Sequence, residues 1–383
     1  MCFQIGLTMK KSILLSALLV AMLSLTAQAQ RFEQILFKKG DCGYHTFRIP
    51  ALVQTKSGAI LAFAEARKNS GSDTGDIDLV MKRSTDGGKT WSGMTMVWDD
   101  AENVCGNPSP VVDSRSGRII LTMTWNNGKD PENKIHAKTS IDTRRVFVTF
   151  SDDEGLSWST PREITDQAKR SDWQWYATGP CHSIQLQKGT HKGRIVVPCD
   201  HSKTGEGSNS HVIYSDDLGQ SWHIGGILRH GNESTITQLK NGDLMLNMRC
   251  GSKKLRNEMS RQRLVAISHD GGETFDEAYL DKGLIEPVCN ASIINYAPKG
   301  KLTTTVLFSN PKDGEKRTNM SLSISRDSGK TWNESILISD KATAYSDLLI
   351  LPNGDVALFY ERGEEKPYDT MVFTVIPKTE ITR

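Results

Sequence analysis

A short pattern that recurs five times restricts the fold of this sequence more than any other feature. The copies begin at Ser84, Ser151, Ser215, Ser268 and Ser325 and read STDGGKTW, SDDEGLSW, SDDLGQSW, SHDGGETF and SRDSGKTW. The Ser and Asp of each copy can bond the backbone of a tight turn, the Gly allows a positive φ, and the aromatic residue can pack beneath. We interpret the copies as joints that lock the fold and expect no catalysis by their aspartates, Asp86, Asp153, Asp217, Asp270 and Asp327.

A second repeat alternates with the first. Six segments consist of an apolar run, a polar turn with Gly and another apolar run, a pattern typical of a β-hairpin. Their turn glycines are Gly58, Gly117, Gly193, Gly242, Gly300 and Gly354. Separations of roughly 50–75 residues between the copies predict one four-stranded antiparallel sheet repeated around an axis. The predicted fold is therefore all-β, a six-bladed β-propeller forming a single domain over residues 30–383, whose sixth blade is completed by a strand near residues 32–37.

Residues 1–29 carry the pattern of a secretory signal peptide. Lys10 and Lys11 precede an apolar run over residues 13–25, and Ala27, Gln28 and Ala29 form a small-residue cleavage site. No later apolar run is long enough to span a bilayer. We therefore expect an exported protein, periplasmic or extracellular, without a membrane span.

The overall charge gives no sign of a polyanionic partner. The chain has 47 Lys and Arg against 45 Asp and Glu, and loss of residues 1–29 removes two Lys and no acid, leaving 45 of each. Neither a nucleic-acid nor a membrane partner is expected from this balance. An anionic ligand would have to be bound by local Arg side chains.

The cysteines permit disulfides without predicting a metal site. Six of the seven remain after loss of the signal peptide, an even count that allows pairing in an exported chain. Cys181 and Cys199, which flank one hairpin, are the first pair to test, and a chain with no bridge is equally compatible with a core of this size. No Cys or His spacing is typical of a metal site, so the cysteines and histidines do not predict a metal.

The open ends of the six hairpins should gather on one face of the ring, because each hairpin has its turn at one end and its free strands at the other. The residues at these ends are Arg48, Arg67, Trp125, Asp200, Glu233, Arg249, Tyr345 and Glu361, with Arg317 shortly after the fifth hairpin. A single Arg at a strand end is more often a solvated charge. Several Arg converging with Glu and Tyr on one funnel favour a site that binds a carboxylate.

Several short motifs at these positions resemble those of a known family. They are FRIP at residues 47–50, AEAR ending in Arg67, GNES around Glu233, MR ending in Arg249, Arg317 itself, and YSD from Tyr345. Together with the five turn motifs, known as Asp boxes, they resemble the exo-acting sialidases (neuraminidases) of the bacterial and animal type over about residues 40–365. Asp boxes alone are weak support because other secreted propellers carry them, whereas the combination with FRIP and the spaced Arg, Glu and Tyr is specific.

The resemblance implies a role for each position. Arg48, Arg249 and Arg317 would grip the substrate carboxylate, and Glu361 would hold Arg48 in place. Tyr345 would be the nucleophile and Glu233 the base that takes its proton. Arg67 would lie near the C4 oxygen of the substrate. Asp73 falls at the acid/base position, although Asp76 and Asp78 are close and Asp78 fits better as a strand residue.

The implied chemistry explains these residue types. Sialic acid carries its carboxylate on the anomeric carbon, so it repels an anionic nucleophile but not a neutral Tyr. Sialidases are known exceptions to the paired-carboxylate glycosidases for this reason. A free Tyr has a pKa of about 10 and needs a base such as Glu233. The implied enzyme is a glycoside hydrolase, a retaining exo-α-sialidase that releases terminal sialic acid from sialylated glycoproteins, glycolipids or oligosaccharides through a Tyr-linked covalent intermediate. This implied chemistry requires no metal and no organic cofactor.

Two other functions fit the same residues. A trans-sialidase would differ mainly in acceptor binding and in how water is managed, and a non-catalytic sialic-acid-binding propeller would use the same Arg residues without turnover. The presence of Tyr345, Glu233 and Asp73 favours an enzyme. Trp125 and Trp175 are candidates for the pocket rim, with ordinary loop packing as the alternative.

Overall fold

The computed structural model describes residues 31–258 and 261–382, and the predicted signal peptide lies outside these residues. From Glu33 onward the described residues form one compact unit that consists mainly of strands. The short helices are η1 (Asp41–Gly43), α2 (Glu132–Ala137), α3 (Thr165–Ala168), α4 (Lys253–Glu258), η2 (Pro298–Gly300) and α5 (Lys378–Ile381). Within this part of the chain, none of the helices is long and apolar enough to cross a membrane.

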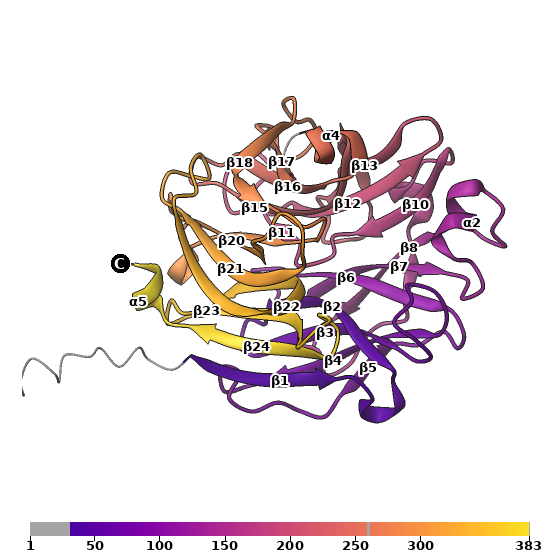
Figure 1. Ribbon diagram of the computed structural model, residues 1–383, viewed down its shortest axis with the longest axis horizontal. Helices are drawn as coiled ribbons and strands as arrows, with labels where there is room; N and C mark the ends of the chain where they lie inside the picture. Colours follow the sequence, from indigo (N-terminus) through magenta and orange to yellow (C-terminus); the bar gives the residue numbers. More distant parts are fainter. Residues whose placement is uncertain (1–30, 259–260, 383) are drawn as a thin grey trace, which may run out of the picture. The chain divides into compact units, whose positions relative to one another are not determined.

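The strands form six antiparallel blades that follow one another around a common centre, which confirms the predicted six-bladed propeller (Figure 1). Blade 1 consists of β2 (Thr46–Gln54), β3 (Ile60–Arg67), β4 (Ile77–Ser84) and β5 (Thr95–Trp98). Blade 2 consists of β6 (Val104–Val112), β7 (Ile119–Asn126), β8 (Arg145–Ser151) and β9 (Arg162–Glu163). Blade 3 consists of β10 (Trp173–Thr178), β11 (Ile184–Gln185), β12 (Ile195–Lys203), β13 (Gly207–Ser215) and β14 (His223–Arg229). Its inner strand is in two pieces, because β10 and β11 both pair with β12.

The last three blades close the ring. Blade 4 consists of β15 (Gly231–Gln238), β16 (Leu244–Cys250), β17 (Gln262–Ser268) and β18 (Tyr279–Ile285). Blades 5 and 6 contain β19 (Ser292–Asn295), β20 (Val306–Pro311), β21 (Thr318–Ser325), β22 (Glu334–Ile350), β23 (Val356–Gly363), β24 (Thr370–Ile376) and β1 (Phe32–Lys38). The long β22 is shared, since its first half pairs with β21 and its second half with β23. Strand β1 pairs with β24, so the N-terminal strand completes blade 6 as expected.

The hydrophobic core lies between neighbouring blades. Between blades 1 and 2, for example, Phe63 and Leu79 share one buried cluster with Leu121 and Met123. Similar clusters fill the other junctions, because each blade buries both faces against its neighbours. Closing the ring is therefore what covers the two terminal blades.

Each Asp box forms the turn between the third and fourth strands of a blade. In the copy of blade 3, the Ser215 hydroxyl donates to Asp217 Oδ1 at 2.8 Å and accepts from Gly219 N at 2.8 Å. Asp217 also accepts from the backbone and side chain of Ser221 at 2.9 and 2.6 Å. Gly219 has φ 85°, and Trp222 is buried beneath the turn. In the other four boxes the Asp likewise accepts from a hydroxyl and a backbone N–H, so each motif forms the turn that the sequence predicts.

Replacing Asp217 with Ala should lower stability without changing the pocket. The variant loses the hydrogen bonds that close one turn, which should cost about 1–2 kcal/mol of unfolding free energy. Denaturant unfolding measures this loss, and the turnover number of the folded fraction should stay at the wild-type value. An Asp217→Ala protein of normal stability but without activity would contradict the structural interpretation.

Blade 3 contains a buried pair of histidines. The His201 ring stacks on Trp173, with centroids 3.5 Å apart, and its Nδ1 lies 3.0 Å from Nδ1 of His211. Burial lowers the pKa of His201 to about 3 and lowers the pKa of His211 well below its usual value. Both side chains are therefore neutral near pH 7, with one Nδ1 donating to the other.

Acid should destabilise the fold through this pair. Below about pH 6.5 the two histidines bind protons in the unfolded chain but stay neutral when buried in the folded protein. Each His therefore lowers the unfolding free energy by up to about 1.4 kcal/mol for each pH unit of acidification. His201→Phe keeps the stack on Trp173 but cannot titrate. Urea unfolding between pH 7 and pH 5 should therefore show a shallower loss of stability in the variant, and equal slopes would exclude the pair as the cause.

Candidate active site

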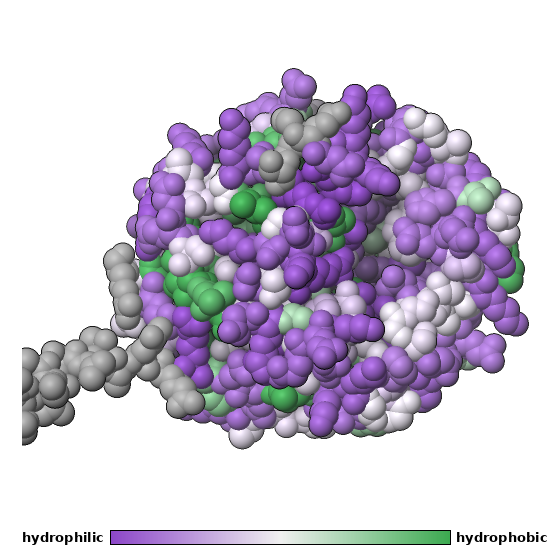
Figure 2. Space-filling model, viewed as in Figure 1, coloured by the Kyte–Doolittle hydropathy of each residue, from purple (hydrophilic) through white to green (hydrophobic). Residues whose placement is uncertain are grey.

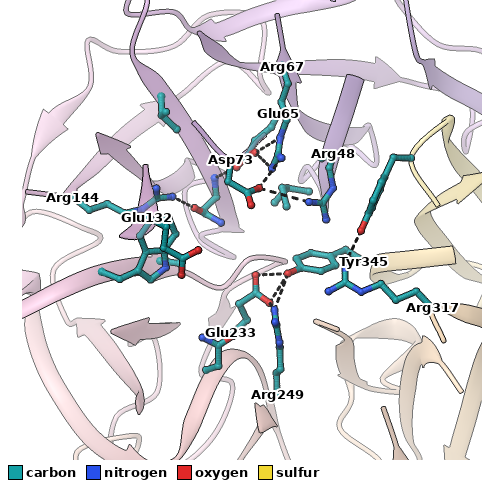
Figure 3. Close-up of a pocket in the computed structure, with 17 residues that line it drawn as sticks. Arg48, Glu65, Arg67, Asp73, Glu132, Arg144, Glu233, Arg249, Arg317 and Tyr345 are labelled. Carbon is teal, nitrogen blue, oxygen red and sulfur yellow. Dashed lines mark hydrogen bonds and ion pairs between the residues drawn. The ribbon is translucent and has the colours of Figure 1, made fainter. Parts of the chain in front are cut away.

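One cavity opens on the face where the open ends of the hairpins meet. Its volume is about 310 Å³, and Figure 2 shows hydrophilic residues around the hollow near the middle of this face. The predicted residues that line it are Arg48, Arg67, Asp73, Glu233, Arg249, Arg317 and Tyr345. The structure thus brings together these side chains from four blades, the first, fourth, fifth and sixth (Figure 3).

Irregular strand pairing aims several of these side chains into the cavity. The register shifts within residues 48–51 of β2, 106–109 of β6, 173–176 of β10, 231–234 of β15 and 343–346 of β22. Such bulges re-aim side chains and are common next to active sites. These segments contain five residues that line the cavity: Arg48, Asn107, Trp175, Glu233 and Tyr345. The backbone is unusual there, with φ 63° at Ile49 and 52° at Asn107.

Tyr345 and Glu233 form a hydrogen-bonded pair at the floor of the cavity. The Tyr345 hydroxyl lies 2.6 Å from each carboxylate oxygen of Glu233. Arg249 Nη1 donates to Glu233 Oε2 at 2.7 Å and to the Tyr345 oxygen at 3.2 Å. Burial, and then the charge of Glu233, raise the pKa of Tyr345 well above its usual value. The phenol is therefore neutral and in contact with a base that can take its proton.

Three arginines surround the Tyr345 ring. The guanidinium carbons of Arg48 and Arg317 lie 5.0 and 5.6 Å from the ring centroid, and Arg249 contacts the hydroxyl. Arg317 is fixed by bonds from Nη1 to the Tyr368 hydroxyl at 2.8 Å and from Nη2 to Val288 O at 2.7 Å. Burial disfavours each cation, but nearby acidic groups outweigh it and raise the pKa of all three. Convergent guanidinium groups of this kind bind a carboxylate well.

Glu361 lies behind the cavity and is fully buried. Its Oε1 accepts from Arg48 Nε at 3.1 Å and from Ile49 N at 2.9 Å. Its Oε2 accepts from Arg48 Nη2 at 3.3 Å and from Tyr345 N at 3.1 Å. One carboxylate therefore orients both Arg48 and the backbone of Tyr345.

Asp73 is the one of three neighbouring aspartates that lines the cavity. Its Oδ1 lies 2.6 Å from Arg67 Nη1 and 3.7 Å from Arg48 Nη1, and its side chain is 59% exposed. Burial would raise the pKa of Asp73, but Arg67 and Arg48 outweigh it and lower the pKa. Asp78 instead is buried in β4 and accepts from the Tyr44 hydroxyl at 2.5 Å. Asp73 is therefore ionised when the cavity holds no ligand.

Five further polar residues line the cavity that the sequence had not singled out. They are Glu65, Asn107, Glu132, Arg144 and Tyr368, and Asn232 beside Glu233 also lines the cavity. Arg144 precedes β8 and Tyr368 precedes β24, which are the third strands of their blades and begin on the same face as the hairpin ends. The position of Arg317 just before β21 follows the same rule, so this signal was present in the sequence. Asn107 depends on a bulge and had no such signal.

Some expected positions lie elsewhere. Trp175 lines the cavity, whereas Trp125 donates to Asp100 Oδ2 at 2.7 Å outside its lining. Asp200 is fully buried, and burial raises its pKa well above the usual value. The six cysteines of the described residues are free thiols. Cys181 and Cys199 are not paired, since their sulfurs are directed at Ala291 O (3.3 Å) and Val197 O (3.7 Å).

Comparisons with known proteins agree with this geometry. The family described as BNR repeat-like domain matches residues 58–358. The chain is 31% identical to a sialidase from Bacteroides fragilis over 84% of this chain and 61% of that protein. It is 32% identical to an exo-alpha-sialidase from Aspergillus fumigatus over 74% of this chain and 69% of that protein. Among solved structures, a Hadza microbial sialidase matches with a TM-score of 0.79 and 28% identity, over 91% of this chain and 69% of that one. The chain thus spans less than two thirds of the Bacteroides fragilis protein.

Proposed function

The chain belongs to the sialidase family, and from this premise we propose that it is a retaining exo-α-sialidase that hydrolyses terminal sialic acid from glycoconjugates. The observation that carries the proposal is the Tyr345 hydroxyl at 2.6 Å from both oxygens of Glu233, inside a cavity lined by five arginines. A neutral nucleophile beside its base, with cations around it, suits a substrate whose reacting carbon bears a carboxylate.

The first half of the reaction forms a glycosyl bond to Tyr345. Arg48, Arg249 and Arg317 hold the substrate carboxylate while positive charge develops on the sugar ring. Tyr345 attacks the anomeric carbon as Glu233 takes the phenolic proton, and the glycosidic bond breaks. A tyrosine nucleophile gives retention because a second displacement must follow.

We assign Asp73 as the general acid that donates a proton to the leaving group. In the structure this carboxylate is ionised because Arg67 and Arg48 hold its pKa down. A substrate carboxylate bound to Arg48 offsets part of that positive charge, so the pKa of Asp73 should rise as the substrate enters. Asp73 then donates to the departing oxygen and, in the second half, takes a proton from the water that attacks the anomeric carbon, while Glu233 returns its proton to the departing Tyr345 oxygen.

Incubation with a fluorogenic α-sialoside tests the proposal. We expect turnover, with the α anomer of sialic acid as the first sugar seen by NMR. Binding without turnover would instead identify a sialic-acid-binding propeller, and a first-formed β anomer would contradict the retaining mechanism. Addition of lactose as an acceptor separates hydrolysis from transfer, because a trans-sialidase would yield sialyllactose as its main product.

A further inference from the structure

A chain of hydrogen bonds runs from blade 3 to a carboxylate in the cavity wall. The backbone N–H of Trp175 donates to Ser202 Oγ at 3.1 Å. Ser202 Oγ lies 2.7 Å from Nδ1 of His136, and Nε2 of His136 lies 3.1 Å from Glu132 Oε1. Glu132 and Trp175 line the cavity, and Figure 3 shows Glu132 across the cavity from Arg317.

The chemistry of these groups gives the chain one direction. The amide of Trp175 can only donate, so Ser202 Oγ accepts from it and keeps its own hydrogen for a second bond. The Glu132 carboxylate accepts, so Nε2 of His136 carries the hydrogen that faces it, and in this arrangement Nδ1 accepts the hydroxyl hydrogen of Ser202. Every group in the chain of hydrogen bonds then has a compatible partner.

His136 is held by blade 3 as well as by its own short helix. Ser202 is buried in β12, with 6% of its surface exposed, and the His136 ring lies 6.1 Å from the Trp175 ring at an interplanar angle of 29°. Arg144 covers the Trp175 ring as well, with its guanidinium carbon 4.0 Å from the centroid. The Glu132–His136 contact is thus anchored at one end, unlike a free surface pair four residues apart on a helix.

Glu132 differs from the other carboxylates that line the cavity. Glu65 and Asp73 are paired with Arg67, and Glu233 is paired with Arg249. Glu132 is paired with His136, whose Nε2 contacts a single carboxylate oxygen. A carboxylate that no guanidinium contacts directly keeps its oxygens free to accept from sugar hydroxyl groups.

We propose that His136 is a positioning residue, anchored by Ser202, that holds the carboxylate of Glu132 in the cavity as an acceptor for hydroxyl groups of the bound sugar. The identity of that sugar rests on the proposed sialidase function. Because these hydroxyls lie away from the reacting carbon, the contact should strengthen binding of the ground state and the transition state alike.

Kinetics of matched variants test the proposal. His136→Asn cannot reach Glu132, so KM for the α-sialoside should rise about tenfold with kcat within about twofold. His136→Gln keeps an N–H donor near the position of Nε2 and should restore most of the affinity. His136→Asn should add nothing further in a Glu132→Gln background, because one interaction is lost only once. The matched control is His269→Asn, which removes a His held by Asp243 and Asp276 at 3.1 and 3.2 Å outside this cavity and should leave KM unchanged.

The outcomes separate the two proposals. The role of His136 would be overturned if the wild type turned over the α-sialoside and His136→Asn had an unchanged KM. Additive effects of His136→Asn and Glu132→Gln would overturn it as well. Absence of wild-type turnover would contradict the sialidase function instead, and in that case nitrogen NMR of the imidazole still decides on the hydrogen-bond chain. We expect a His136 signal protonated at Nε2 that is absent in His136→Asn and altered in Ser202→Ala, whereas a proton on Nδ1 would exclude the chain.

Discussion

Tyr345→Phe should fold like the wild type and lose at least about a thousandfold in kcat, the scale of loss when an attacking oxygen is removed. The substitution deletes the hydroxyl that contacts Glu233 and Arg249 and keeps the ring that packs between Arg48 and Arg317. Turnover of the fluorogenic α-sialoside measures the loss, and thermal unfolding checks that the protein is intact.

Tyr368→Phe is the matched control for this variant. It also removes a phenolic oxygen from the cavity, but that oxygen accepts from Arg317 at 2.8 Å and is not bonded to Glu233. Its effect should be far smaller than that of Tyr345→Phe. Similar losses in the two variants would indicate that Tyr345 acts by shaping the cavity, not as the nucleophile.

Trapping of the intermediate adds a chemical readout. A fluorinated sialosyl fluoride slows the breakdown of a glycosyl-enzyme, so mass spectrometry of the wild type should show one added sugar on the peptide that contains Tyr345. An adduct located on Glu233 or Asp73 would show that the nucleophile is assigned wrongly. The same reagent should leave Tyr345→Phe unmodified.

Arg317→Lys should lower kcat/KM by about a hundredfold although the charge is kept, since one well-placed donor commonly accounts for that much. Arg317 uses one nitrogen for Tyr368 and the other for Val288 O, and this planar arrangement orients the guanidinium beside the Tyr345 ring. A Lys ammonium has no such fork and cannot be oriented by both partners while it binds a carboxylate. Steady-state kinetics measure the loss.

A surface arginine provides the comparison for Arg317→Lys. Arg326 holds Glu334 through two bonds of 3.0 and 2.6 Å away from the cavity, so Arg326→Lys should leave kcat/KM unchanged. Both variants should melt close to the wild type, because Lys keeps the positive charge and neither residue belongs to the hydrophobic core. Near-normal kinetics in Arg317→Lys would remove this residue from the carboxylate site.

Much of the fold could be predicted because its signals are local. Each Asp box encodes its turn within eight residues, through a Ser, an Asp and a Gly whose bonds the structure repeats five times. The hairpin glycines have the positive φ that their turns require, for example 96° at Gly58 and 108° at Gly242. Blade count and strand order follow from these repeats alone, and so does the face on which the hairpin ends meet.

The pairing within that face was less accessible to sequence reasoning. Arg48 and Glu361 are 313 residues apart, and their contact exists only because β1 and blade 6 bring the two ends of the chain together. The additional contact from Glu361 to the Tyr345 backbone has the same origin. The ligand-free ion pair between Asp73 and Arg67 likewise depends on where the loop after β3 folds back, which the spacing of three aspartates does not specify.

By itself, the sequence determined the six-bladed propeller and the set of charged residues at its open face, because turn chemistry and strand alternation act within a few residues. Only the tertiary structure decided how those side chains are aimed. The bulges at Arg48, Glu233 and Tyr345 break the regular alternation of strand residues, and Ile49 adopts φ 63°, a conformation that a β-branched residue avoids on its own. Local preferences argue against such a backbone, and it persists because contacts from the rest of the ring, such as the bond from Ile49 N to Glu361, hold it in place.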